Sequence, residues 1–250
     1  MDSYKKIFEN KQKVLLFTAH PDDAEINAGG LISRLVADGK EPRIVVVTNG
    51  INGNKTVLSY NKTKFSNIRI KSQIESANAL GVLPRNIINL GIEDGYVENN
   101  IETIKAFVKQ IREFKPDIVI THSPHDSIIK YKNGIYWANH RDHRNVAQNV
   151  IDAVYPYSRD ANFFPDLIKE GANPHYVEEM LFFEQFDDVN EHLIDITEFL
   201  ATKESALRKH MASRVLSDTD INVFINENRV KSRYYERFGY VIINRLNTIK

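Results

Sequence analysis

The sequence contains no cysteine among its 250 residues, and this absence excludes several kinds of site. Disulfide frameworks, thiolate nucleophiles and cysteine-ligated zinc or iron–sulfur centres all require that residue. Any metal therefore has to be held by histidine and carboxylate side chains. The chain is otherwise of ordinary globular composition, with 42% hydrophobic and 26% charged residues, which excludes disorder, collagen and coiled coil.

The sequence also lacks an excess of either charge. Lysine and arginine number 33, as do aspartate and glutamate, so the formal net charge is zero and no global positive field exists to hold a nucleic acid. Residues 229–240 mix basic and tyrosine side chains like an RNA-binding surface, but the neutral total favours a packed terminal element.

No apolar stretch approaches the roughly 18 to 20 residues that span a bilayer. Residues 1–13 lack the apolar segment of a signal peptide. We therefore expect a cytoplasmic protein that does not associate with a membrane.

Three well-known nucleotide and hydrolase motifs are missing. Gly29-Gly30 lies inside a predicted helix, so the dinucleotide pattern G-x-G-x-x-G is absent after the first predicted strand. Residues 50–56 resemble a phosphate-binding loop only loosely, because Asn54 replaces the glycine before the lysine. No G-x-S-x-G element supports a serine hydrolase.

Apolar runs alternate with helical patterns over the first half of the chain, which predicts right-handed crossovers between parallel strands. We expect an α/β fold, a Rossmann-like, doubly wound, mostly parallel sheet in a three-layer αβα arrangement. The predicted strands are Val14–Ala19, Arg43–Thr48, Ile87–Leu90 and Asp117–Thr121, and the predicted helices between them are Ala24–Asp38, Phe65–Leu80 and Ile101–Phe114.

The second half is less regular. A loop over residues 123–137 precedes a helix over His143–Val154, and residues 155–176 are predicted to be a surface excursion. Strands over Met180–Glu184 and Leu193–Ile196 and a helix over Thr197–Ala212 follow. No repeat or linker interrupts the chain, so we expect a single domain over residues 1–250.

Ligands of open parallel sheets bind at the carboxyl ends of the strands, so the residues that follow strands are the candidate site. His20 and Asp23 follow the first predicted strand, three residues apart across a turn at Pro21. Such an imidazole and carboxylate can converge on one cation, which would leave Asp22 free as a proton acceptor. The alternative is an ordinary acidic helix start.

Two later segments are also rich in histidine. His140 and His143 share one face of a predicted helix start, where one of them is enough to complete a three-ligand site. A surface histidine pair is the alternative for them. His122 and His125 are more simply explained as residues of a polar loop without special function. His175, His192 and His210 are expected to be structural or peripheral.

These motifs carry a family resemblance. AHPDDAE at 19–25 followed by Gly29-Gly30, with HRDHR at 140–144, resembles the LmbE/PIG-L family of zinc-dependent N-deacetylases. The likeness covers nearly the whole chain, and its further elements are Thr48-Asn49-Gly50, residues 69–82, Asn89-Leu90-Gly91 with Asp94, Pro116-Asp117, residues 195–197 and residues 203–213.

The resemblance implies one Zn²⁺ per subunit, with another divalent metal possible, held by His20, Asp23 and His143. It implies that Asp22 is the general base. It also implies that His140 stabilises the oxyanion or protonates the leaving amine, with Asp142 orienting that imidazole, and that Arg69 and Asp94 contact a sugar. The implied reaction releases acetate from an N-acetylglucosamine-type sugar or glycoside, and relatives that form trimers or hexamers imply a possible homo-oligomer.

Two departures from the family bear on the substrate. Tyr131, Tyr136 and Trp137 stand in the segment before His140, where aromatic rings could stack on a sugar as a specificity lid. Arg141 stands where the family commonly has proline and adds a charge that could favour an anionic substrate group. Hydrolysis of a non-sugar amide or a phosphoester is the alternative reaction, and a metal-bound binding module is the non-enzymatic one.

Overall fold

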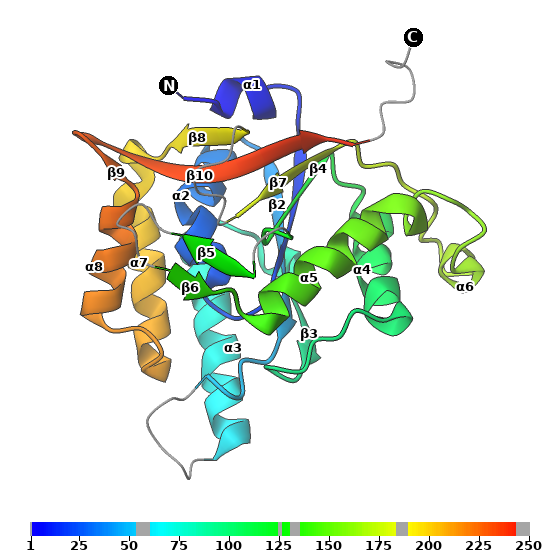
Figure 1. The fold of residues 1–250 in the computed structure, drawn as a ribbon, viewed down its shortest axis with the longest axis horizontal. Coiled ribbons are helices and arrows are strands. Elements are labelled where there is room, and N and C mark those ends of the chain that lie inside the picture. The colour runs from blue at the N-terminus through cyan, green and yellow to red at the C-terminus, as the bar shows by residue number, and fades with distance from the viewer. Residues whose placement is uncertain (1, 54–60, 125–126, 131–135, 184–189, 244–250) are drawn as a thin grey trace.

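The computed structural model describes residues 2–53, 61–124, 127–130, 136–183 and 190–243. Within these residues an eight-stranded sheet has the order β3-β2-β1-β4-β7-β10-β8, and β9 pairs with β10 (Figure 1). The strands are β1 (Lys13–Thr18), β2 (Glu41–Thr48), β3 (Ile87–Ile92), β4 (Ile118–Thr121), β7 (Glu179–Phe182), β8 (Glu191–Asp195), β9 (Arg229–Val230) and β10 (Arg233–Ile242).

The sheet is mostly parallel, as predicted, because β10 alone among its described strands runs the other way. The pairs from β3 across to β7 are parallel, whereas β10 is antiparallel to both β7 and β8. The predicted fold class is confirmed.

Helices cover both faces of the sheet (Figure 1). The longer ones are α2 (Asp23–Ala37), α3 (Lys62–Ala79), α4 (Ile101–Phe114), α5 (Arg141–Asp152), α7 (Leu200–Lys209) and α8 (Asp218–Glu227), and the short ones are α1 (Tyr4–Phe8) and α6 (Pro165–Lys169). None of the described helices is both long and apolar enough to cross a membrane.

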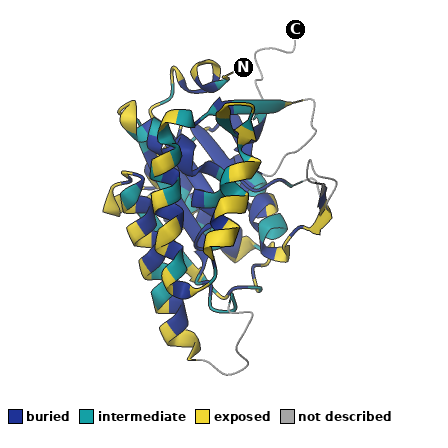
Figure 2. Cartoon of the chain, turned by 90° about the vertical axis from the view of Figure 1, so that its left-hand side faces the viewer, coloured by how far each residue is buried: buried dark blue, intermediate teal, exposed yellow. Residues whose placement is uncertain are grey.

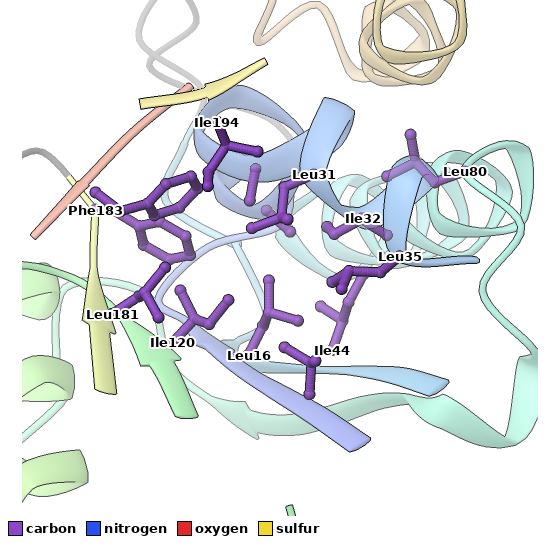
Figure 3. Packing of buried hydrophobic residues seen from close by; sticks show 14 of the residues in the cluster. Leu16, Leu31, Ile32, Leu35, Ile44, Leu80, Ile120, Leu181, Phe183 and Ile194 are labelled. Carbon is purple, nitrogen blue, oxygen red and sulfur yellow. The ribbon is translucent and has the colours of Figure 1, made fainter. Parts of the chain in front are cut away.

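Two hydrophobic cores lie on opposite faces of the sheet, and alternate residues of β1 point into them. Leu16 packs with α2 and α7 in one core, together with Leu31 and Ile194 (Figure 3). Phe17 packs in the other core with α4, where its ring stacks on Phe107 with centroids 4.8 Å apart. Figure 2 shows the buried strands enclosed between partly exposed helices. The αβα layering therefore follows from an uninterrupted apolar β1.

Helix α2 approaches its neighbours closely at Gly29-Gly30. A Cβ added at Gly30 would lie 2.5 Å from the Cβ of Ile196, and one at Gly29 would lie 3.1 Å from Cγ of Lys203. Real side chains cannot approach so closely at Gly30, so a glycine is required there. This packing fixes α2, whose first residue is Asp23.

A buried ion pair also holds α2. Lys203 on α7 and Glu236 on β10 have fully buried side chains, and Lys203 Nζ lies 2.8 Å from Glu236 Oε1. Glu236 accepts the N–H groups of Gly30 and Leu31, and Lys203 Nζ donates to the carbonyl of Ile26, which is the residue four before Gly30. The two charges therefore bond backbone groups in the middle of a helix, and three elements meet at this point.

Several boundaries differ from the prediction. Helix α3 begins at Lys62, three residues before the predicted start at Phe65, because the Asn61 side chain accepts the Lys64 N–H as an N-cap. Helix α5 begins at Arg141, two residues early. The predicted excursion over residues 155–176 is anchored by the buried side chains of Leu167 and Ala172. Glu184, at the end of a predicted strand, lies outside the described residues.

Candidate metal centre and active site

The candidate site lies at the carboxyl edge of the sheet, where β1 is flanked by β2 and β4. Chain order runs outward from β1 in both directions there, so this is the switch point at which open α/β sheets bind ligands. The turns after β1, β3 and β4 and the start of α5 bring together His20, Asp94, His122 and His143.

The turn after β1 is tight and strained. The His20 N–H donates to Asp23 Oδ2 at 2.7 Å, which closes the turn around Pro21. Between them the backbone of Asp22 has φ 122°, a conformation that residues other than glycine rarely adopt. Such a conformation costs about 1–3 kcal/mol and is concentrated at functional sites. The strain at Asp22 therefore supports a site at this turn independently of any motif.

Ligand atoms of His20, Asp23 and His143, the set that the family resemblance implies, converge beside this turn. His20 Nδ1 lies 3.2 Å from His143 Nε2 and 3.5 Å from Asp23 Oδ2, and His143 Nε2 lies 3.4 Å from Asp23 Oδ1. Ligands at the bond lengths of tetrahedral zinc are separated by about 3.4 Å, so this donor set fits such an ion. The side chains are mostly buried, which keeps water from competing for them.

A second group of candidate ligands shares His20. His20, Asp94 and His140 also offer ligand atoms within 4.8 Å of one another, but His140 is exposed. The first group is the more enclosed of the two, so it is the better candidate for a tightly held metal. Asp22 belongs to neither group among the described residues.

The contacts of Asp142 differ from the prediction, which had its carboxylate orienting His140. The carboxylate instead lies 3.2 Å from His20 Nε2 and accepts the N–H groups of Gly95 and Val97. His140 caps helix α5, and its Nδ1 accepts the Asp142 backbone N–H, so the Asp142 side chain points inward beneath His20. A carboxylate behind a ligating imidazole fixes the ring and increases its basicity.

Charge in the site is balanced among imidazoles and carboxylates. Burial lowers the pKa of His20, but hydrogen bonds to Asp142, Asp23 and Asp94 outweigh it and hold the pKa well above its usual value. Burial raises the pKa of Asp23, and the neighbouring imidazoles outweigh it and hold that pKa well below its usual range. The carboxylates of Asp23, Asp94 and Asp142 around His20 supply negative charge that a bound cation would neutralise.

Asp22 is buried next to Arg69. Arg69 Nη2 donates to Asp22 Oδ2 at 3.0 Å and also to the Pro21 carbonyl, and the Asp22 N–H donates to Gln73 Oε1. Burial raises the pKa of Asp22 although Arg69 opposes that effect. Arg69 was expected to contact substrate, but it is only 3% exposed and holds Asp22 from below. Its contact with a sugar stays a prediction.

His122, which the sequence left as a loop residue, is the main site residue that was missed. Its side chain is fully buried, and its Nε2 accepts the Ala19 N–H at 3.0 Å and lies 3.4 Å from Asp23 Oδ2. Its ring stacks on His143 with centroids 3.9 Å apart. The sequence signal that could have placed His122 in the site is its position directly after β4, the strand next to β1. His125 lies outside the described residues.

His210 also has a more definite place than expected. It lies 1% exposed with Nε2 3.2 Å from Glu25 Oε2, and Glu25 accepts a hydrogen bond from Gln73. This buried chain of polar groups runs from η4 (His210–Ser213) to the residue that holds the Asp22 N–H. His175 and His192 contact Pro116 and Ser3 away from the site, as expected of structural residues.

The predicted aromatic segment forms a hairpin of β5 (Ile128–Lys130) and β6 (Tyr136–Ala138). Tyr136 is 63% exposed and Trp137 is 60% exposed. Neighbouring residues of a strand point to opposite faces, so the two rings do not share one face. Trp137 pairs with Ile129, which is buried, so its face of the hairpin is the one turned toward the protein. Tyr131 lies outside the described residues.

Comparison with known proteins decides the family. The family model described as PIG-L, GlcNAc-PI de-N-acetylase, matches residues 15–154, which is more than half of the chain and includes the whole ligand set. The chain belongs to the PIG-L family. The resemblance that the sequence motifs carry is thereby confirmed, and with it the assignment to a family of N-deacetylases.

Relatives and solved structures agree with this assignment. Diacetylchitobiose deacetylase of Thermococcus kodakarensis is 27% identical over 203 residues, which cover 81% of this chain and 70% of that protein. The structure of N,N'-diacetylchitobiose deacetylase from Pyrococcus horikoshii, complexed with an inhibitor, matches with a TM-score of 0.79 at 26% identity and covers 94% of this chain and 85% of that one.

A second kind of relative acts on an inositol glycoside. The 1D-myo-inositol 2-acetamido-2-deoxy-alpha-D-glucopyranoside deacetylase of Rhodococcus erythropolis is 28% identical over 154 residues, which cover 53% of this chain and about half of that protein, 49%. The names of these relatives share an N-acetylated glucosamine unit and differ in what is attached to it.

Proposed function

We propose that this chain is a zinc-dependent hydrolase that removes the N-acetyl group from an N-acetylglucosamine-type sugar or glycoside, with release of acetate and a free amine. The observation that carries the proposal is the convergence of His20, Asp23 and His143 beside a strained, buried Asp22, in a chain of the de-N-acetylase family. The names of its relatives support the sugar substrate.

His20, Asp23 and His143 would hold the metal. A bound Zn²⁺ supplies Lewis acidity toward a carbonyl oxygen and lowers the pKa of water. Asp142 fixes His20 through its Nε2, which leaves Nδ1 directed at the other two ligands. Three protein ligands leave a position open for the reaction, as catalytic zinc sites require.

Asp22 accepts the proton of the attacking water in this proposal. Its carboxylate lies outside the ligand set, and Arg69 holds one of its oxygens in place at 3.0 Å. A positioned base that is not itself a ligand contributes typically about 10²–10⁴-fold to the rate.

His140 is a hydrogen-bond donor beside His20, and the two rings meet edge-on with centroids 4.7 Å apart. Its Nδ1 accepts the Asp142 N–H, so the neutral imidazole carries its proton on Nε2. Burial and the nearby His20 and His143 lower its pKa, which keeps the ring neutral. We assign this N–H to a hydrogen bond with the developing oxyanion. The departing amine takes its proton from Asp22, which returns the proton that it accepted from water, and this completes the cleavage of the C–N bond.

Asp94 and Trp137 are the proposed sugar contacts. Asp94 is buried with its carboxylate 3.3 Å from His20 Nε2, so it lies beside the candidate metal centre, where its oxygens can accept hydrogen bonds from sugar hydroxyl groups. Trp137 offers an exposed ring on the face of the hairpin that is turned toward the protein, where it can stack on a sugar.

The two aromatic residues provide a matched pair of variants. Trp137→Ala is expected to raise KM for a chitobiose-type substrate by about tenfold, the loss of a single stacking contact of the order of 1 kcal/mol. Tyr136→Ala, on the opposite face, is expected to change KM less than twofold. Equal effects from both variants would contradict the assigned face.

The reaction itself is tested by acetate release. Zinc-restored protein is incubated with N-acetylglucosamine, diacetylchitobiose, an N-acetylglucosaminyl inositol, a simple non-sugar acetamide and a phosphomonoester, each with a chelated control. We expect chelator-sensitive acetate from the sugars alone. Acetate from the non-sugar amide, or phosphate from the ester, would select the alternative hydrolases, and no product with zinc verified would overturn the proposal.

A further inference from the structure

The loop after β3 is held by two consecutive residues at the start of α5. Asp142 accepts the N–H groups of Gly95 at 2.6 Å and Val97 at 3.2 Å. Arg141 Nη1 donates to the carbonyl groups of the same two residues, at 3.2 Å for Gly95 and 2.6 Å for Val97. Both the donors and the acceptors of this short segment are therefore bound from one side.

This segment carries Asp94. Gly95 has φ 90°, so the chain turns sharply directly after Asp94 and is directed toward α5. The Asp94 carboxylate lies 3.3 Å from His20 Nε2 and its carbonyl accepts a hydrogen bond from Asn52. Asn145, also on α5, donates to the Val97 carbonyl at 2.7 Å, so Arg141 shares the hold on Val97 and adds the contact with the Gly95 carbonyl next to Asp94.

The contacts of Arg141 also bear on its charge. Its side chain is 47% exposed, but Nη1 is directed at two backbone carbonyl groups rather than at the ligand set. Guanidinium groups bind paired acceptors in a fixed planar geometry, which suits two carbonyls of one loop. The two N–H groups of Nη1 are therefore used within the protein, in contacts with the loop.

We propose that Arg141 is a positioning residue, which helps to fix residues 94–97 and thereby places Asp94 for substrate. The placement of the loop stands on the hydrogen bonds alone. The effect on catalysis rests on the proposed function, in which Asp94 contacts the sugar.

A double-mutant cycle tests the catalytic part. Arg141→Met keeps the aliphatic stem and removes the donors, and is expected to raise KM for the acetylated sugar about threefold to tenfold with kcat nearly unchanged, the loss expected for one or two hydrogen bonds. Arg141→Lys keeps a donor and is expected to recover part of the loss. In an Asp94→Ala background Arg141→Met is expected to raise KM no further.

Two results in this cycle would overturn the inference. The same fold increase in KM with and without Asp94 would mean that Arg141 acts by another route. A loss confined to anionic substrates would mean direct recognition of charge. Arg144→Met is the matched control, because Arg144 lies on the same helix and donates to the Asn139 carbonyl instead.

Hydrogen exchange tests the loop without reference to activity. In zinc-loaded protein, Arg141→Met is expected to speed amide exchange at Gly95 and Val97 at least about tenfold, since the bonds that hold the loop closed contribute roughly 1–2 kcal/mol. Unchanged exchange at both amides would refute the positioning role even in an active enzyme. Faster exchange in a protein without deacetylase activity would leave the loop assignment standing and overturn only the proposed function.

Discussion

The buried pair of Lys203 and Glu236 allows a prediction whose size follows from the structure. Both side chains are fully buried, and Lys203 Nζ lies 2.8 Å from each of Glu236 Oε1, the Ile26 carbonyl and Asn228 Oδ1. Lys203→Met fills nearly the same volume but removes all three hydrogen bonds and leaves Glu236 charged. Breaking a buried pair in this way costs about 3–5 kcal/mol.

A loss of that size is a large part of the total, since domains are stable by only about 5–15 kcal/mol. Lys203→Met is therefore expected to lower the urea midpoint sharply without changing the m-value. Adding Glu236→Gln removes the orphaned charge but keeps an acceptor for the N–H groups of Gly30 or Leu31. The double variant is expected to be more stable than Lys203→Met alone.

The surface pair of Arg208 and Glu204 is the control for this experiment. Their side chains are 44% and 39% exposed, and exposed pairs contribute at most about 1 kcal/mol. Arg208 also pairs with the exposed Asp218, so Arg208→Met removes two exposed pairs and is expected to lower the unfolding free energy by less than about 2 kcal/mol. A loss for Lys203→Met no larger than that for Arg208→Met would refute the reasoning. So would a double variant, Lys203→Met with Glu236→Gln, whose loss of stability equals the sum of the losses for Lys203→Met and Glu236→Gln measured singly.

The remaining predictions concern α2 and the metal site. Gly30→Ala is expected to destabilise the fold by about 1–3 kcal/mol in urea unfolding, because its Cβ would meet Ile196 at 2.5 Å. Gly29→Ala, whose Cβ would meet only the Lys203 chain at 3.1 Å, is expected to be within about 1 kcal/mol of wild type, and equal losses would contradict the packing. His122→Phe keeps a ring beside His143 but removes Nε2, and is expected to weaken zinc binding about 10–100-fold in competition with a chelating dye. Unchanged affinity would remove His122 from the site.

The parallel part of the fold could be predicted because its strands are continuous apolar runs. Val14–Ala19 has no polar alternation, and Ile101–Phe114 has clear helical spacing, so both elements were placed almost as the structure has them. Strand β10 was missed as a member of the sheet, because its sequence RYYERFGYVI mixes charges with aromatic residues. The charge of Glu236 is neutralised by Lys203 on a different element, which no local pattern reveals.

The site was predicted as far as chain position determines it. Chain position indicated His20 and Asp23, with either His140 or His143 as a further ligand, and the family resemblance implied His143. The ligand atoms of His20, Asp23 and His143 lie together in the structure. The inward direction of Asp142 was not predictable, since it depends on how α5 begins. His122 was missed because its burial depends on the packing of β4 against β1, which the local sequence does not reveal.

The central claim is that Asp22 acts on the reaction and that Asp23 holds the metal. The most direct test measures zinc content and acetate turnover for Asp22→Asn and Asp23→Asn in parallel. We expect Asp22→Asn to retain zinc and lose turnover by about 10²–10⁴-fold, and Asp23→Asn to lose both. Near-normal turnover by Asp22→Asn, or full zinc retention by Asp23→Asn, would contradict the assignment.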